Sequence, residues 1–165
     1  MAKVVFKLGN DISTDIIYPG RFMATVLPTE TPQYAFADYA EFNARLKKKE
    51  VAPGDAIVAG LNFGCGSSRE QAASCLKGYD LAVVAKGFAR IFLQNAINLG
   101  LNTIICPEIE ANEGDELEIT REVVINKTSG KTFKVQPLPK ARQAIIDAGG
   151  LIPYTRKRVL EKHGR

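Results

Sequence analysis

Residues 56–106 read AIVAGLNFGCGSSREQAASCLKGYDLAVVAKGFARIFLQNAINLGLNTIIC and hold the pattern that decides the fold. Short apolar runs alternate with stretches of helical length, and such runs are typical of strands buried on both faces of a parallel sheet. The pattern is strand, helix, strand, helix, strand over residues 56–59, 68–77, 81–85, 88–99 and 102–106. The short connections between these elements predict a central parallel β-α-β-α-β core.

The flanking segments extend this core on both sides. Before it, the sequence predicts a strand at 3–8, a loop at 9–20 and a helix at 34–48, where apolar residues recur every three or four positions. After it, segments of alternating polarity predict an added antiparallel β section, and C-terminal helices follow. These segments are residues 116–120, 122–126 and 132–136, then 139–148 and a last helix with Pro153 at its first position. The expected fold class is α/β, with a single domain over residues 1–165.

The composition is that of an ordinary globular domain, with 165 residues of which 45% are hydrophobic and 24% charged. No apolar run approaches the ~20 residues that span a bilayer, and no basic and then apolar leader opens the chain, so we expect neither a membrane protein nor a secreted one. The three cysteines are an odd number at wide spacing, which suits neither a disulfide framework nor a paired zinc site. We therefore expect the protein in a reducing cytoplasm.

The net charge of +4 at pH 7 belongs to one end of the chain. Residues 151–165 carry five basic side chains against Glu161 alone, so residues 1–150 sum to zero. A nucleic-acid-binding domain needs basic side chains spread over one face, which this distribution does not provide. The basic segment is interpreted as a solvated helix or, alternatively, as a docking surface for an acidic partner.

The segment most suited to chemistry is residues 60–70, GLNFGCGSSRE, which joins the first core strand to a helix. Its glycines let the backbone approach a ligand closely. A helix N-terminus attracts anions through its free N–H groups and its dipole. Arg69 adds a forked donor suited to carboxylate or phosphate. Together these features predict a site for an anionic small molecule.

The two serines of this segment also have a purely structural interpretation. Ser67 and Glu70 match the capping box S-x-x-E, and Ser68 and Gln71 match it again one residue later. If Ser68 caps the helix, the Ser67 hydroxyl is released and can face the loop. If Ser67 caps the helix, backbone N–H groups occupy its oxygen.

Other kinds of site are disfavoured. Gly64-Cys65-Gly66 is followed by Arg69 where a dinucleotide motif needs its third glycine, and the phosphate-loop pattern G-x-x-x-x-G-K-S/T is absent from this segment. A nucleophilic Cys65 would need a histidine, and His163 in the C-terminal tail is the only one. The chain also lacks the usual ligand set of a metal site, so we expect it to hold no metal.

Several stretches of this sequence resemble the swivel domain of the aconitase superfamily. They are NFGCGSSRE (62–70), GFARIF (87–92), NAINLGL (95–101), DISTD with PGR (11–15 and 19–21), and AGGL (148–151). The similarity is strongest to the free-standing small subunits of 3-isopropylmalate dehydratase and homoaconitase, and it covers essentially the whole chain. The resemblance implies an aconitase-like swivelling β/β/α domain.

The resemblance also implies a hydro-lyase that removes and re-adds water on a hydroxy di- or tricarboxylate, as in leucine biosynthesis. A large subunit would carry a [4Fe–4S] cluster on its own cysteines, and this chain would close the active site as part of a heterodimer or heterotetramer. Ser67 matches the catalytic serine, the general base for the carbon-bound proton, with Arg69 beside it. Gly66, Ser68 and Asp15 match substrate-binding positions. Because a serine hydroxyl is a weak base, the helix N-terminus, loop N–H groups and Arg69 would have to stabilise its alkoxide.

Substrate choice in this family depends on the segment after Pro-Gly-Arg, which here reads FMAT (22–25). An arginine at the position of Ala24 would suit an extra carboxylate, with which alanine cannot pair. We therefore expect a substrate with a hydrophobic substituent, such as isopropylmalate or 2,3-dimethylmalate, rather than homocitrate; packing alone is the alternative role of this segment. Arg21 and Thr25 are candidate substrate contacts, whereas Arg90 is interpreted as tying its helix to a neighbouring loop.

Two further classes of function remain open. A stand-alone dicarboxylate-binding module would bind its ligand measurably without a partner, whereas a subunit with half a site would bind little. An RNA-binding role is disfavoured by the zero net charge of residues 1–150. Because the affinity of a protein for RNA falls with rising salt concentration, an affinity that does not change with salt would dismiss this role. We expect no nucleic-acid partner and no membrane.

Overall fold

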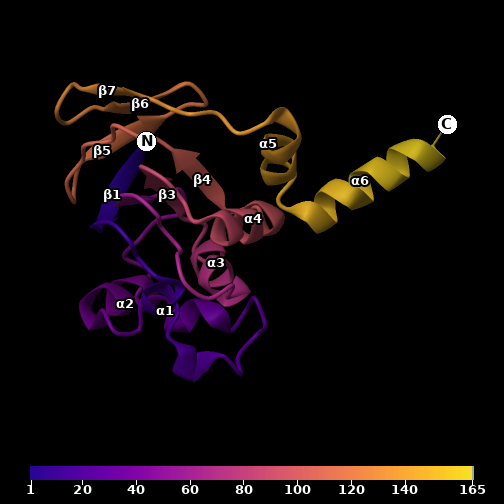
Figure 1. Cartoon of the computed structure of the whole chain (residues 1–165), viewed down its shortest axis with the longest axis horizontal. Helices are drawn as coiled ribbons and strands as arrows, with labels where there is room; N and C mark the ends of the chain where they lie inside the picture. The colour runs from indigo at the N-terminus through magenta and orange to yellow at the C-terminus, as the bar shows by residue number, and fades with distance from the viewer. Residues whose placement is uncertain (165) are drawn as a thin grey trace.

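The computed structural model describes residues 1–164, and its centre is a seven-stranded sheet (Figure 1). The strands are β1 (Ala2–Lys7), β2 (Ala56–Ala59), β3 (Ala82–Ala85), β4 (Asn102–Ile105), β5 (Glu116–Ile119), β6 (Val123–Asn126) and β7 (Thr132–Lys134). Their order across the sheet is β4-β3-β2-β1-β5-β6-β7. Strands β1 to β4 pair in parallel, while β1, β5, β6 and β7 pair antiparallel. The predicted parallel core and antiparallel section are therefore confirmed.

Helices cover one face of the parallel strands. α3 (Glu70–Lys77) connects β2 to β3, and α4 (Arg90–Leu99) connects β3 to β4. Ile57 and Val83 face the cluster of apolar side chains that these helices complete, whereas their neighbours Val58 and Val84 face the other way. Burial on both faces explains why these strands are continuously apolar rather than alternating.

The antiparallel strands fold back over the other face. Leu117, Val124 and Phe133, one from each of β5, β6 and β7, join Val58 and Val84 in a second buried cluster. A backbone hydrogen bond ties the segment after β7 to the edge strand β4, from the N–H of Gln136 to the carbonyl of Ile105 at 2.8 Å. Figure 1 shows the resulting layers, with β5–β7 above the parallel strands and α1–α3 below them. The predicted β/β/α arrangement is confirmed.

The two C-terminal helices are α5 (Lys140–Asp147) and α6 (Leu151–His163). α6 extends away from the rest of the chain in Figure 1, and none of its residues is buried. The basic segment is thus an exposed helix. Pro153 is its third residue rather than its first, because the N-cap residue is Gly150, with a φ of +125°, and the helix begins at Leu151. Among residues 1–164, no helix combines the length and apolarity needed to cross a membrane.

The prediction of a loop over 9–20 misses a short helix, α1 (Thr14–Ile17). Ser13 caps it, because its hydroxyl accepts a hydrogen bond from the N–H of Ile16 at 3.3 Å. A single turn is too short to show helical periodicity, so the capping serine was the only local signal.

The prediction of a helix over 34–48 is wrong in its first half. α2 (Ala40–Lys47) begins six residues late, after a short 3₁₀ helix over Thr31–Tyr34. Between the two, Phe36 has a φ of +50° and is fully buried, with its N–H donating to the carbonyl of Ile17 at 2.8 Å. Its ring meets that of Phe6 edge to face, with centroids 5.2 Å apart. Burial of this ring in the core overrides the helical spacing.

Candidate active site

The loops that follow β1, β2 and β3 meet at the carboxyl ends of these strands. Segment 60–69 is the loop after β2, and it lies between the loop after β1 and the loop after β3. On one side, the N–H of Thr14 donates to the carbonyl of Cys65 at 2.9 Å. On the other side, the N–H of Phe63 donates to the carbonyl of Gly87 at 3.0 Å. Ligands of open α/β sheets bind at this end of the strands.

Two glycines shape the loop for different reasons. Gly64 has a φ of +85°, and a Cβ built there would lie 2.2 Å from Cγ of the Phe92 side chain. That ring packs edge to face on Phe63, with centroids 5.2 Å apart, so the loop backbone is pressed against the aromatic core. Gly66 has a similar φ of +91°, but the nearest atoms to its Cβ position are 3.8 Å away. Glycine is therefore required for packing at 64 and only for backbone conformation at 66.

Ser67 is held by its backbone and leaves its side chain exposed. Its carbonyl oxygen accepts the hydroxyl of Thr14 at 2.9 Å and the N–H of Arg69 at 2.8 Å. Within residues 1–164 its own hydroxyl makes no hydrogen bond, and the same is true of Ser68, which is also exposed. The structure thus presents the Ser67 hydroxyl to solvent on a backbone that is fixed on both sides.

Both capping alternatives for the serines are wrong. α3 begins at Glu70, its N-cap residue is Arg69, and no side chain accepts a hydrogen bond from the first turn. The bond from the N–H of Arg69 to the carbonyl of Ser67 forms a tight turn, which delays the start of the helix by two residues. The Ser67 hydroxyl is therefore released from capping without Ser68 taking that role.

Arg69 is tied to the loop after β1. Its Nη1 donates to Oδ1 of Asp15 at 2.6 Å and to the carbonyl of Tyr18 at 3.2 Å, and its side chain is only 17% exposed. The same Asp15 oxygen accepts the N–H of Gly20 at 2.8 Å. These two hydrogen bonds, that from Arg69 first, hold the pKa of Asp15 below its ordinary value.

This ion pair corrects the expected electrostatics of Ser67. The charge of Arg69 faces a carboxylate, so it is less available to stabilise an alkoxide than an unpaired guanidinium would be. Within residues 1–164 the Nε and Nη2 groups of Arg69 make no hydrogen bond, which leaves donors for a substrate carboxylate.

Replacing Arg69 with Gln is expected to raise the pKa of Asp15 towards its ordinary value. A carboxylate with a depressed pKa stabilises the folded state above its ordinary pKa, and this contribution is lost as the pH falls through the folded value. The difference in stability between the wild type and Arg69→Gln should therefore shrink as the medium becomes acidic. An NMR titration of the Asp15 carboxyl tests this.

The matched control for this titration is Arg21→Gln, which removes the partner of Asp38. A hydrogen bond from Arg21 is the first cause of the lowered pKa of Asp38. Arg21 makes no hydrogen bond to Asp15 and lowers the pKa of that carboxyl only weakly, through its charge. An Asp15 pKa that does not move in Arg69→Gln would contradict the assignment of its shift to that pair.

The segment expected to choose the substrate is a turn beside the ion pair. The hydroxyl of the buried Tyr18 donates to the carbonyls of Phe22 at 3.0 Å and Thr25 at 3.3 Å, which fixes both ends of this turn. The amide of Gln71 in α3 donates to the carbonyl of Met23 at 3.4 Å, so the turn lies next to the start of the helix that follows Ser67. Ala24 is exposed at its tip, and Thr25 is half-buried.

Three exposed side chains close to Ala24 in the chain are apolar. Met23, Val26 and Leu27 are all among the exposed large hydrophobic side chains. An exposed apolar patch of this kind is typical of a contact surface, for a substrate substituent or a partner.

Two arginines of the sequence analysis differ from expectation. Arg21 forms an exposed ion pair with Asp38, so it is not a free donor for substrate. Arg90 is the exposed first residue of α4, and within residues 1–164 it ties this helix to no loop by hydrogen bond or ion pair. Besides Arg69 and Asp15, the residues that join these loops include Thr14, Tyr18 and Gln71. Thr14 lies in the DISTD stretch, whereas nothing local distinguishes Tyr18 or Gln71 from core and surface residues.

The cysteines do not form a reactive centre. Burial raises the pKa of the Cys75 thiol and raises that of Cys106 to about 11, so both stay protonated at neutral pH. Cys65 is half-buried in the loop, while His163 lies at the end of α6. Within residues 1–164, no three His, Cys, Asp or Glu side chains gather into a group that could hold a metal ion.

Comparison with known proteins places these loops in a family. The model of the aconitase C-terminal domain family matches residues 11–108, which is more than half of the chain and includes Asp15, the segment 60–69 and Gly87. The chain belongs to this family. The resemblance to the aconitase superfamily is therefore confirmed.

Similar proteins of this family span nearly the same length. The 3-isopropylmalate dehydratase small subunit of Methanosarcina mazei is 45% identical over 161 residues, which cover 95% of this chain and 97% of that protein. The isopropylmalate/citramalate isomerase small subunit of Methanocaldococcus jannaschii is 46% identical over 164 residues, with 95% and 94% covered. The crystal structure of 3-isopropylmalate dehydratase from the same archaeon matches with a TM-score of 0.88 and 41% identity, covering 98% of this chain and 96% of that one. The expected similarity to such small subunits is confirmed, as is the aconitase-like fold.

Proposed function

We propose that this chain is the small subunit of a heteromeric hydro-lyase, 3-isopropylmalate dehydratase, which interconverts 2- and 3-isopropylmalate by dehydration and rehydration. The observation that carries the proposal is the Ser67 hydroxyl, exposed and without a partner in residues 1–164, next to an Arg69 that Asp15 and Tyr18 hold in place. Relatives that are 44% and 45% identical over nearly the whole chain bear the name of this small subunit.

In this proposal Ser67 is the base that takes the proton from the substrate carbon. Arg69 binds a substrate carboxylate with its unoccupied N–H groups, and Asp15 fixes the guanidinium. Ser68 and the backbone of Gly66, both exposed in the same loop, complete the contacts to the dicarboxylate. The first turn of α3 follows Ser67 and has no side-chain cap, so in this proposal its free N–H groups, rather than the paired charge of Arg69, lower the cost of the alkoxide form of serine.

The partner in this proposal is a large subunit that supplies the other half of the site. Ser67, Ser68 and Gly66 lie on an open surface of this chain, as expected where a second polypeptide closes the site. Residues 1–164 do not fit the [4Fe–4S] cluster of the superfamily, because they contain no three-ligand group. We therefore assign that cluster to the large subunit, and place the complex in the cytoplasm, where free thiols stay reduced.

Reconstitution tests this function. The chain is mixed with a cluster-loaded large subunit encoded beside it, and hydration and dehydration are followed for isopropylmalate, citramalate, dimethylmalate and homocitrate. Turnover that needs both chains and favours an alkylmalate supports the proposal. A dicarboxylate that binds the isolated chain tightly, with no turnover in the mixture, would instead support the stand-alone binding module.

Citramalate is a second candidate substrate, because one relative is named isopropylmalate/citramalate isomerase small subunit. The apolar residues Met23, Val26 and Leu27 suit any alkyl substituent and do not choose between methyl and isopropyl. One methylene group changes binding in an apolar pocket by about 10–200-fold, so methyl and isopropyl substituents would differ in affinity without either being excluded. A shared substrate range is thus compatible with this surface, whereas the extra carboxylate of homocitrate is not.

Replacing Ala24 with Arg is expected to shift this preference. Beside the alkyl group of isopropylmalate the new guanidinium would lose water without gaining a partner, so kcat/KM for this substrate should fall about tenfold. With homocitrate it would pair with the third carboxylate, so kcat/KM should rise. Ala24 is exposed, so the variant should fold normally. Thr29→Arg adds the same charge at another exposed position and should leave the ratio unchanged. An unaltered substrate profile in Ala24→Arg would show that specificity is set elsewhere.

A further inference from the structure

Tyr18 lies between two parts of the proposed active site and contacts both of them. It directly follows α1 and is fully buried. Its hydroxyl reaches the turn 22–25, while its backbone carbonyl accepts Nη1 of Arg69 at 3.2 Å. One residue thus contacts both the segment proposed to choose the substrate and the guanidinium proposed to bind a substrate carboxylate.

The hydroxyl of Tyr18 holds the turn from its buried side. It lies 3.0 Å from the carbonyl oxygen of Phe22 and 3.3 Å from that of Thr25. Since a hydroxyl carries one proton, the two carbonyls share it. Burial raises the pKa of Tyr18, so the group remains a donor at neutral pH. The N–H of Thr25 also donates to the carbonyl of Phe22 at 3.0 Å, which makes the four residues one closed turn.

The two ends of the turn depend on this hydroxyl to different extents. The ring of Phe22 stacks on that of Tyr34, with centroids 4.1 Å apart, so the first end is also held by packing. At the other end, the Tyr18 hydroxyl is the one hydrogen-bond donor to the carbonyl of Thr25 within residues 1–164. The position of Ala24, at the tip between them, therefore depends on Tyr18.

One more side chain reaches the turn from outside. The amide of Gln71 donates to the carbonyl of Met23 at 3.4 Å, in an exposed position. Water competes for these groups, whereas the ring and hydroxyl of Tyr18 are shielded from it. Tyr18 is therefore the side chain on which the geometry of the turn mainly depends.

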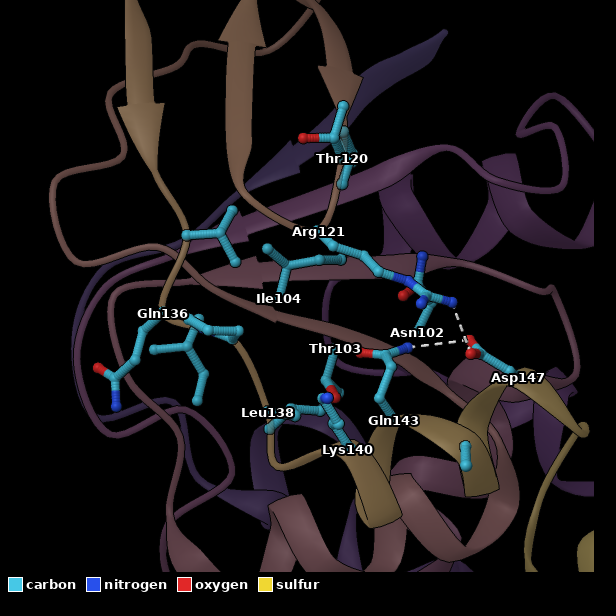
Figure 2. Close-up of a pocket in the computed structure, with 15 residues that line it drawn as sticks. Asn102, Thr103, Ile104, Thr120, Arg121, Gln136, Leu138, Lys140, Gln143 and Asp147 are labelled. Carbon is cyan, nitrogen blue, oxygen red and sulfur yellow. Dashed lines mark hydrogen bonds and ion pairs between the residues drawn. The ribbon is translucent and has the colours of Figure 1, made fainter.

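Two other hydroxyl groups, by contrast, hold no segment in place. Thr103 in β4 lies at a cavity of about 640 Å³ between that strand, the β5–β6 turn and α5 (Figure 2), and its buried Oγ1 has no hydrogen-bond partner within residues 1–164. The half-buried Tyr79, just after α3, also makes no hydrogen bond through its hydroxyl in this part of the chain. Both residues lie away from the turn 22–25 and serve as matched controls.

We propose that Tyr18 is a positioning residue for substrate choice, which holds the turn 22–25 in a fixed place relative to Arg69. This role rests on the proposed function, in which Arg69 binds a carboxylate and the turn meets the alkyl substituent. A substrate held by Arg69 then presents its substituent to a wall that does not move. A wall held in place can distinguish substituents of different size, whereas a mobile one loses part of its contact with the larger substituent.

Tyr18→Phe tests this role, because it removes the hydroxyl and keeps the ring. In the reconstituted complex KM for isopropylmalate should rise about tenfold. The value of kcat should change less than about twofold, since the carbonyl of Ser67 is held by Thr14. Citramalate carries a smaller methyl group that meets less of the turn, so the ratio of kcat/KM for isopropylmalate to that for citramalate should fall about fivefold.

This ratio separates positioning from a purely structural role. A variant that is only less stable lowers the concentration of active complex, which reduces kcat/KM for both substrates by the same factor. Tyr79→Phe and Thr103→Val each remove a hydroxyl and should leave the ratio unchanged. A ratio that stays the same or rises in Tyr18→Phe would overturn the inference. A wild type that turns over neither alkylmalate would overturn the proposed function, and this role with it.

Hydrogen exchange of the isolated full chain needs no substrate. In Tyr18→Phe the N–H of Thr25, which is bonded inside the turn, should exchange about tenfold faster. The N–H of Gly20, bonded to Asp15, should keep its rate, because the carbonyl of residue 18 still holds Arg69. Unchanged exchange at Thr25 would show that the turn does not depend on the hydroxyl, and would overturn the inference even if the complex is active.

Discussion

Replacing Ser67 with Ala is expected to lower kcat of the reconstituted complex by about 10³–10⁴-fold, because a positioned general base contributes up to that factor. KM for isopropylmalate should change little, since the carboxylate contacts that we propose for Arg69 and the loop N–H groups remain. The structure favours a clean result, because the Ser67 hydroxyl makes no hydrogen bond within residues 1–164. Removing it should alter the free energy of unfolding by less than about 0.5 kcal/mol.

Ser68→Ala is the matched control, one residue along the same exposed turn. Because we propose that Ser68 binds substrate, its replacement should raise KM more than it lowers kcat, whereas Ser67→Ala should mainly lower kcat. Absorbance of the unsaturated acid reports turnover, and co-purification with the large subunit reports assembly. A Ser67→Ala complex that keeps more than about a tenth of the wild-type kcat would remove this hydroxyl from the mechanism.

Replacing Gly64 with Ala should have the largest effect on stability. The new Cβ would fall 2.2 Å from the buried Phe92 side chain, and the backbone φ of +85° is unfavourable for any residue with a Cβ. Overpacking costs about 1–3 kcal/mol and the left-handed conformation about 1–2 kcal/mol, so a loss of about 2–5 kcal/mol is expected. That is a large fraction of the 5–15 kcal/mol (approximately) that stabilises an ordinary domain.

Gly66→Ala separates the two causes. Its φ of +91° imposes a similar backbone penalty, but the nearest atoms to its Cβ position are 3.8 Å away. Urea unfolding should therefore show a loss of only about 1–2 kcal/mol for Gly66→Ala. Equal losses in the two variants would mean that contact with Phe92 contributes nothing and that the loop moves to accommodate the methyl group.

The parallel core could be predicted from local patterns, because strands that are buried on both faces of a sheet are continuously apolar in sequence. The runs AIVA (56–59) and LAVVA (81–85) are apolar without alternation, and parallel strands between helices are the main context in which such runs occur. The antiparallel section was readable for the complementary reason, since one of its faces is solvated and its polarity alternates. Phe36 illustrates the limit, because its fully buried ring and its φ of +50° break a helix that spacing alone predicts.

The candidate site was only partly readable in the same way. Glycines, serines and an arginine at the end of a strand indicate an anion site, but the partners of these residues lie about 50 positions away in the chain. Thr14 with Ser67, and Asp15 with Arg69, come together because the loops after two adjacent parallel strands leave the sheet at the same edge. The sequence predicts a capping serine for α3 for a related reason. The Ser67 carbonyl accepts a hydrogen bond from Thr14 in the neighbouring loop as well as one from Arg69, and the local sequence does not show the first of these.

The sequence by itself determined the α/β architecture, the order of the core elements and the loop that carries Ser67 and Arg69. These follow from the periodicity of apolar residues and from motifs within a few positions of each other. Only the tertiary structure decided that Arg69 is paired with Asp15 and that neither serine caps α3. The physical reason is that hydrogen bonding and ion pairing depend on distance in space, which the packing of the sheet sets.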